Sequence, residues 1–155
     1  MWKSCCKSRI KFFFWLLLRD RINTRNLLRR KTRTLDFYNC ELCAQDVEET
    51  LLHLFFECSF SQNCWHYLGI HRNLNLQPDA MLLQARENFQ SRIFREILMV
   101  ACWTLWCYRN RVIFDEAPTS FGAWKHLFLE EIMLVRPRAK PSVQSRLDLF
   151  FNSLL

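Results

Sequence analysis

The chain has 155 residues, of which 50% are hydrophobic and 15% aromatic, and it carries a formal net charge of +7. Its length suits one domain with a core of its own, and its apolar composition excludes an intrinsically disordered protein. With two glycines and four prolines, the chain lacks the turn residues that a fold of many short strands requires. The sequence therefore predicts a mainly α-helical protein.

Charge is divided unevenly along the chain. Residues 1–33 contain eleven Lys or Arg and one acid, whereas residues 34–65 contain six acids and neither Lys nor Arg. A basic segment beside an acidic one indicates a phosphate-facing patch next to a separate module. An equally weighted alternative is a solvated basic face, or one that pairs with the acidic segment.

The first two helices are predicted over residues 11–21 and 25–33. The earlier one is apolar on nearly every face and should be buried, and Thr24 with Asn23 supplies a cap for the next. Three arginines recur at every fourth position of this second helix and share one face: Arg25, Arg29 and Arg33. Further on, Asp46 and Glu49 resemble a capping box, which predicts a helix over 47–57, followed by another over 61–68.

Three segments are predicted from the change in composition after Gly69. Residues 1–68 form a first module, residues 69–90 a polar linker with a short helix, and residues 91–155 a helical C-terminal region. In the last segment we expect an apolar helix over 91–114, a helix capped by Ser120, and a final helix that opens at Pro141.

Eight cysteines are compatible with a secreted disulfide framework, but that class needs an export signal. The basic start followed by apolar residues 12–18 imitates a signal peptide. However, Arg19-Asp20-Arg21 follows at once without a small-residue cleavage site, and no apolar run approaches the roughly 20 residues of a membrane span. We therefore expect an intracellular protein with reduced cysteines and no membrane partner, and keep a secreted disulfide protein as the weakest alternative.

Three cysteines and one histidine are spaced as ligands of a single metal ion: Cys40, Cys43, His53 and Cys58. One tight turn can present both sulfurs of the first pair. Because a spacing of five does not return to the same helix face, Cys58 should lie at or just past the end of the helix that carries His53. Three thiolates and an imidazole close a tetrahedral shell, which is typical of a structural zinc site.

Other roles for these residues remain open. The four could be buried free cysteines with a core histidine, and Cys64 could replace Cys58 if the helix ended early, although we favour a packing role for Cys64. The remaining cysteines have no matching histidine spacing and are expected as core or exposed thiols: Cys5, Cys6, Cys102 and Cys107.

Five short runs follow one another in order: Ile10–Trp15, Asp20–Arg25, Cys40–Cys43, Glu49–Cys58 and Cys64–Trp65. Over residues 2–68 their apolar, basic and ligand positions resemble the zinc-binding domain of plant non-LTR retrotransposon reverse transcriptases. The resemblance implies that Cys40, Cys43, His53 and Cys58 carry zinc. Residues 101–114 are similar to the helical tail often found after this domain, to which we attach no activity. The chain lacks a Tyr-x-Asp-Asp motif and an RNase H-like carboxylate cluster, so we expect a non-enzymatic remnant of a larger polyprotein.

The function predicted from these features is a zinc-binding structural module that contacts RNA or DNA through its basic N-terminal helices. The arginines expected to bind nucleic acid are Arg21, Arg25, Arg29, Arg30 and Arg33. The alternative is a structural connector that binds the parent polymerase or another protein. Trp2, Trp15, Phe37 and Tyr38 could stack on bases, although aromatics are more often buried. The basic cluster at 29–33 and the retroelement resemblance suggest a nuclear location; the oligomeric state is not predicted.

Overall fold

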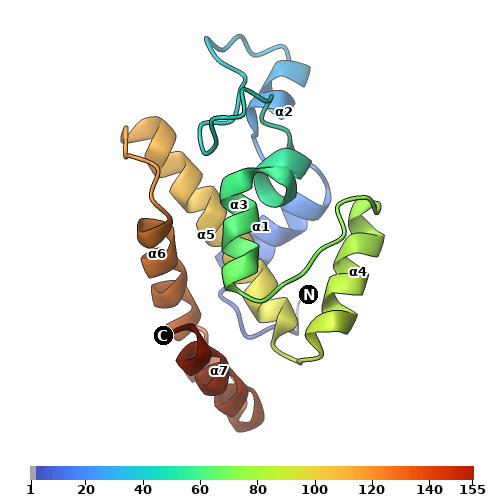
Figure 1. The fold of residues 1–155 in the computed structure, drawn as a ribbon, viewed down its shortest axis with the longest axis vertical. Coiled ribbons are helices and arrows are strands. Elements are labelled where there is room, and N and C mark those ends of the chain that lie inside the picture. The colour runs from blue at the N-terminus through green and yellow to red at the C-terminus, as the bar shows by residue number, and fades with distance from the viewer. Residues whose placement is uncertain (1–2) are drawn as a thin grey trace.

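The computed structural model describes residues 3–155, so Trp2 and the start of the predicted 1–68 module lie outside the described residues. The described chain is mainly helical, as predicted, and contains no β-strand, only an isolated antiparallel bridge between Asn39 and Glu48 (Figure 1). In chain order its helical elements are α1 (Ser8–Leu18), α2 (Arg25–Arg30), the π-helical turn η1 (His53–Glu57), α3 (Ser59–Tyr67), α4 (Pro78–Phe89), α5 (Phe94–Phe114), α6 (Phe121–Met133), the 3-10 turn η2 (Arg136–Arg138) and α7 (Pro141–Leu154).

The long helix α5 forms the centre of the molecule. It packs against α1, α6 and α4, and most of its side chains between Phe94 and Arg109 are buried. The apolar helix predicted over 91–114 is present as α5, and six of its apolar side chains lie in the core: Phe94, Ile97, Leu98, Ala101, Leu105 and Tyr108. No helix between residues 3 and 155 combines the length and the apolar character that crossing a bilayer demands.

The first module and the C-terminal region share one hydrophobic core. Phe13 of α1 contacts Trp103 and Trp106 of α5, with ring centroids 5.4 and 6.2 Å apart, and it also contacts Phe55 of η1 at 6.2 Å. The core cluster runs from Cys6 to Leu147. The division of the chain into three segments stays a prediction, but its first and third parts bury their apolar faces against each other.

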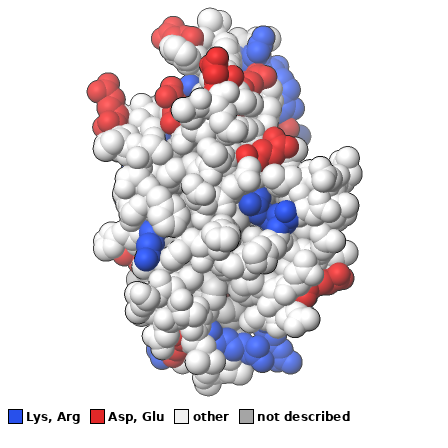
Figure 2. Space-filling model, in the orientation of Figure 1, with Lys and Arg blue, Asp and Glu red and all other residues white. Residues whose placement is uncertain are grey.

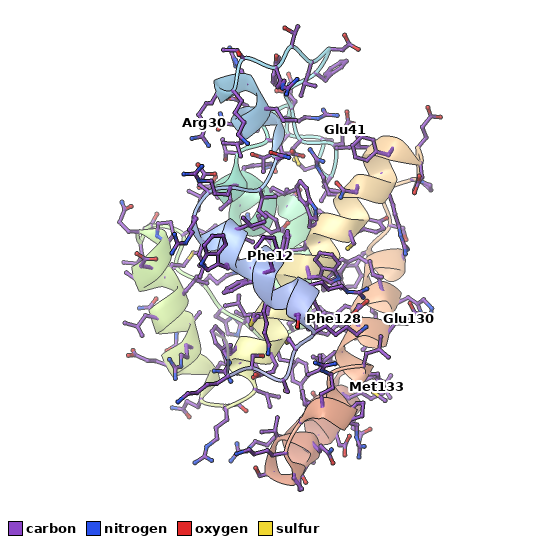
Figure 3. All side chains as sticks on the ribbon, turned by 180° about the vertical axis from the view of Figure 1, so that it is seen from behind. Phe12, Arg30, Glu41, Phe128, Glu130 and Met133 are labelled. Carbon is purple, nitrogen blue, oxygen red and sulfur yellow. The ribbon has the colours of Figure 1, made fainter. Side chains whose placement is uncertain are left out.

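Helices α6 and α7 of the C-terminal region begin where the sequence predicts, whereas α5 begins at Phe94 rather than at residue 91. Ser120 caps α6 by accepting a hydrogen bond from the backbone N–H of Ala123 at 3.3 Å, and Pro141 is the first residue of α7. Phe128 points from α6 into the core, whereas Glu130 and Met133 point away from it (Figure 3). An ion pair between Arg136 and Asp148, 2.6 Å between its atoms, holds α7 to η2.

The first two helices end earlier than predicted. Helix α1 spans Ser8–Leu18 rather than 11–21, and Asp20 adopts a left-handed conformation with φ 50° that cannot continue a helix. Thr24 caps α2 as expected, its hydroxyl accepting from the Leu27 N–H at 3.3 Å. The helix stops at Arg30, and Thr32 has φ 60°, so the prediction that Arg33 shares a helical face with Arg25 is wrong.

The capping box predicted at Asp46 and Glu49 is also wrong. Asp46 has φ 54°, and the residues that follow it pair with residues 38–40 instead of forming a helix. The Cys40 N–H donates to the Val47 carbonyl at 2.8 Å, and the Glu49 N–H donates to the Tyr38 carbonyl at 2.9 Å. Helical structure begins only at Leu51, because these backbone groups are already engaged in the hairpin-like pairing.

Candidate metal centre

The first two predicted metal ligands, Cys40 and Cys43, lie in a tight loop closed by the Asn39–Glu48 bridge. The loop is anchored from inside by Leu42, which is 3% exposed, while Cys40 is buried and Cys43 half-buried. The backbone N–H of Leu42 points to the Cys40 sulfur, and that of Gln45 points to the Cys43 sulfur. Both sulfurs therefore face the same side of the loop. The two N–H groups favour the thiolate forms, whereas burial acts the other way and the pKa of each thiol is raised.

His53 and Cys58 stand at the two ends of the π-helical turn η1. The Cys58 N–H donates to the His53 carbonyl at 2.7 Å, and Cys58 itself has an extended backbone, with φ −53° and ψ 133°. The expectation that Cys58 lies at the end of the helix carrying His53 is confirmed. A π-turn is wider than an α-turn, so a spacing of five residues returns both side chains to one side.

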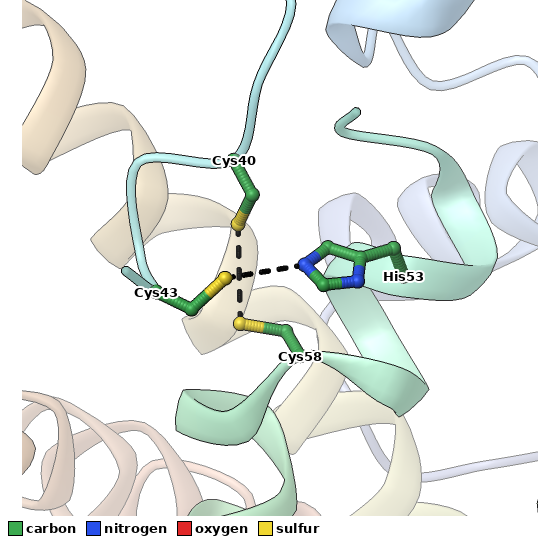
Figure 4. A group of neighbouring side chains, drawn as sticks. All are labelled: Cys40, Cys43, His53 and Cys58. Atoms are coloured by element: carbon green, nitrogen blue, oxygen red, sulfur yellow. Dashed lines mark hydrogen bonds between the residues drawn. The ribbon is translucent and has the colours of Figure 1, made fainter. Parts of the chain in front are cut away.

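The four side chains converge on one point, and their ligand atoms all lie within 4.8 Å of one another (Figure 4). The Cys40 and Cys58 sulfurs are 3.9 Å apart, and the Cys43 sulfur is 3.4 Å from Nε2 of His53. Zinc bonds of about 2.3 Å to sulfur and about 2.0 Å to nitrogen give a tetrahedron with edges of about 3.8 Å and about 3.5 Å, respectively. The spacing of the donor atoms therefore fits a zinc ion.

The electrostatics of the cluster favour a cation between the sulfurs. The hydrogen bond between the Cys40 and Cys58 sulfurs, together with the Ser61 and Phe60 backbone N–H groups at the start of α3, lowers the pKa of Cys58 to about 5 against the opposing effect of burial. The same hydrogen bond, together with burial, raises the pKa of Cys40. A zinc ion would take the place of the proton between these two sulfurs and relieve the repulsion between neighbouring thiolates.

Residues 1–65 match the family described as zinc-binding in reverse transcriptase. This part of the chain is a reverse transcriptase zinc-binding domain. The family and the donor set agree on the cofactor, which is zinc. No curated protein and no solved structure matches the chain.

Cys64 lies at the edge of the zinc-binding domain but outside the metal cluster of the described residues. It is fully buried in α3, where burial raises the pKa of its thiol, so it stays protonated as a packing residue should. Burial likewise raises the pKa of Cys102, and it raises the pKa of Cys6 and Cys107 to about 11. Cys6, Cys64 and Cys102 belong to the core, Cys107 is half-buried, and none of the four belongs to the cluster of the described residues.

Three of the five arginines predicted to bind nucleic acid form ion pairs with acids of the zinc-binding domain. Arg25 contacts Glu41 at 3.1 Å and the Asn39 carbonyl at 2.7 Å, and its side chain is only 11% exposed. The other two pairs, Arg29–Glu48 and Arg30–Asp20, lie on the surface. Arg21 and Arg33 are exposed on the segments that flank α2.

Glu49 and Arg109 form a buried ion pair that the sequence analysis missed. Nε of Arg109 donates to a Glu49 oxygen at 2.9 Å, and the Arg25 backbone N–H donates to the other oxygen at 2.9 Å. The Glu49 side chain is fully buried and that of Arg109 is 5% exposed. The sequence feature that could have indicated this pair is an arginine on a predominantly apolar helix, because a buried guanidinium requires an acidic partner. The pair fastens the zinc-binding domain to α5.

Proposed function

We propose that this chain is a zinc-stapled structural module of a plant retrotransposon reverse transcriptase, in which Cys40, Cys43, His53 and Cys58 bind one Zn²⁺. The observation that carries the proposal is the convergence of their four ligand atoms within 4.8 Å. Four protein ligands leave no open coordination position for a substrate, which is the form of structural rather than catalytic zinc sites. The proposed role is therefore not enzymatic.

The metal would cross-link segments of the chain that are otherwise joined through packing and hydrogen bonds. The loop with Cys40 and Cys43 is joined to η1 across the cluster, and Cys58 also begins α3 (Figure 4). Zinc bound here would fix this loop on the hydrophobic core, and the loop in turn positions Glu41 and Glu48 against the arginines of α2.

We further propose that the basic N-terminal helices contact RNA or DNA. The exposed side chains of Arg21 and Arg33 support this, and Arg29 and Arg30 are 61% and 51% exposed in surface ion pairs. Surface pairs contribute about 0–1 kcal/mol, so these arginines can exchange a carboxylate for a phosphate. Arg25 has a supporting role, because its guanidinium is largely buried against the zinc loop. A nuclear location would follow from such a role.

Zinc content and chelation test the structural part of the proposal. Protein purified under reducing conditions should contain one zinc per chain by atomic emission, and a chelator should remove helical signal in circular dichroism because metal binding and folding are coupled. Zinc-free protein whose helical spectrum does not respond to chelator would overturn the assignment of the four ligands.

A docking role for a partner protein is the second candidate. A cavity of about 590 Å³ lies between the zinc-binding domain and the end of α5, with Trp106 and Ile113 in its lining. Phe37 and Phe114 at its edge are 64% and 73% exposed, which is unusual for side chains of this size. Concentration-dependent association of zinc-loaded protein, with no affinity for nucleic acid at low salt, would favour this candidate.

A further inference from the structure

A second basic surface lies at the end of the molecule opposite α2, where three distant parts of the chain meet around a hollow of about 350 Å³. These parts are the segment before α1, the start of α5 and the connection from η2 to α7. Cations dominate the lining of this basic hollow: Lys3, Arg92, Arg95, Arg138 and Lys140. Lys and Arg side chains gather at this lower end of the molecule in Figure 2.

The positive charge of the basic hollow is largely uncompensated. Its lining includes one carboxylate, Glu96, whose side chain is 3% exposed and lies 3.1 Å from Arg95. Within residues 3–155, Lys3, Arg92 and Lys140 take part in no ion pair. The arginine face around α2 differs in this respect, because acids neighbour three of its arginines.

Two features of the fold favour the binding of an anion in the basic hollow. Nε of Arg138 donates to the Cys5 carbonyl at 3.2 Å, which fixes the guanidinium while its terminal N–H groups stay available. Helix α7 begins beside the hollow at Pro141 and has no acidic residue in its first turn, so its dipole adds positive potential to that of the side chains.

We propose that the basic hollow binds the phosphodiester backbone of a nucleic acid. Five cations from three chain segments cover more than one phosphate, and guanidinium groups match phosphate oxygens in paired hydrogen bonds. A protein partner fits less well because Val143 is the only aliphatic side chain in the described lining, and protein interfaces depend on larger apolar anchors. This site is separate from the arginine face around α2.

Titration of a fluorescein-labelled 20-nucleotide RNA with full-length, zinc-loaded protein tests the proposal. Three triple variants each remove three positive charges. Lys3→Gln/Arg92→Gln/Lys140→Gln changes the basic hollow, Arg21→Gln/Arg29→Gln/Arg33→Gln changes the arginine face, and Arg86→Gln/Arg111→Gln/Arg146→Gln is the control. The control residues are exposed and form no ion pair in the described chain. Circular dichroism melting establishes that each variant is folded.

The hollow variant should bind RNA about tenfold or more weakly at 0.1 M salt, and its plot of log affinity against log salt should flatten by about two units. Arg92→Lys, which keeps the charge, should bind nearly as the unchanged protein does. The proposal is overturned if the hollow variant binds like the control, or if the unchanged protein does not bind RNA at low salt. A loss confined to the arginine-face variant would support the proposed function and reject the hollow.

Discussion

At the scale of single residues, the four proposed zinc ligands differ in how much else each one does. Cys58 is the capping residue between the end of η1 and the start of α3 and lies fully buried, so replacing it would disturb both helices as well as the metal. Cys40 is also buried and donates a backbone hydrogen bond that closes the loop. Cys43 is half-buried on the loop, and its side chain contacts mainly the other ligands. It is therefore the residue whose replacement reports most directly on metal binding.

We expect Cys43→Ser to abolish stoichiometric zinc binding. A serine hydroxyl is a poor zinc ligand at neutral pH, so the variant forfeits much of a binding free energy on the order of 10 kcal/mol. Zinc content by atomic emission and the midpoint of thermal unfolding should both fall. A variant that keeps one zinc per chain and the melting curve of the unchanged protein would contradict the assignment of Cys43.

Cys64→Ser is the matched control for this substitution. Cys64 is buried within six residues of Cys58, but it lies outside the cluster. Placing a hydroxyl there costs about 1–3 kcal/mol of unfolding free energy if it finds no partner, yet zinc should stay at one per chain. Loss of zinc from Cys64→Ser as well as from Cys43→Ser would favour the alternative in which Cys64 replaces Cys58 as a ligand.

At the scale of elements, the Glu49–Arg109 pair joins the segment before η1 to the last third of α5. We expect Glu49→Ala to lower the free energy of unfolding by about 3–5 kcal/mol, because it leaves the buried Arg109 guanidinium without its carboxylate. Urea denaturation followed by circular dichroism measures this loss. Zinc should still bind, because Glu49 is no member of the cluster.

The surface pair Arg29–Glu48 supplies the comparison for this prediction. Arg29 is 61% exposed, so Arg29→Ala should change the free energy of unfolding by less than about 1 kcal/mol. If both variants unfold at the same urea concentration, the buried pair does not fasten α5 to the zinc-binding domain in the way inferred from its burial.

The elements that could be predicted from the sequence are those set by local chemistry. Thr24, Ser120 and Pro141 mark helix starts because hydroxyl caps and proline act within one turn, and the structure has helices that begin at each of them. The metal cluster was predicted for the same reason, since its four ligands fall within nineteen residues and their types and spacing carry the chemistry.

The errors arise where distant contacts decide the local structure. Glu49 follows Asp46 at the spacing of a capping box, but its carboxylate is bound by Arg109, sixty residues away, and its backbone pairs with Tyr38. No local pattern reports a partner at that separation. The π-turn of η1 could not be predicted either. A π-turn holds one residue more than an α-turn, and here it brings His53 and Cys58 to the same side. Helix propensities do not distinguish between the two kinds of turn.

At the scale of the whole molecule, the zinc-binding domain does not bury its apolar side chains alone. Ile10, Phe13 and Leu17 of α1 are in the core, and the α5 side chains that cover α1 lie far beyond the residues that match the family. Phe60 of α3 likewise stacks on Tyr108 of α5, with ring centroids 5.4 Å apart. Zinc can fix the cysteine loop, but it cannot replace the α5 side chains that cover α1 and α3.

We therefore expect a fragment of residues 1–68 to lack cooperative thermal unfolding even with zinc, because removing α5 exposes the side of α1 that carries Phe13. A fragment of residues 1–140 is the matched control. It loses α7, whose one buried side chain is Leu147, and it should keep one zinc and a sigmoidal melting curve at a lower midpoint. Circular dichroism of both fragments with zinc present decides the matter. A cooperative transition of the 1–68 fragment would show instead that the zinc-binding domain folds without the tail.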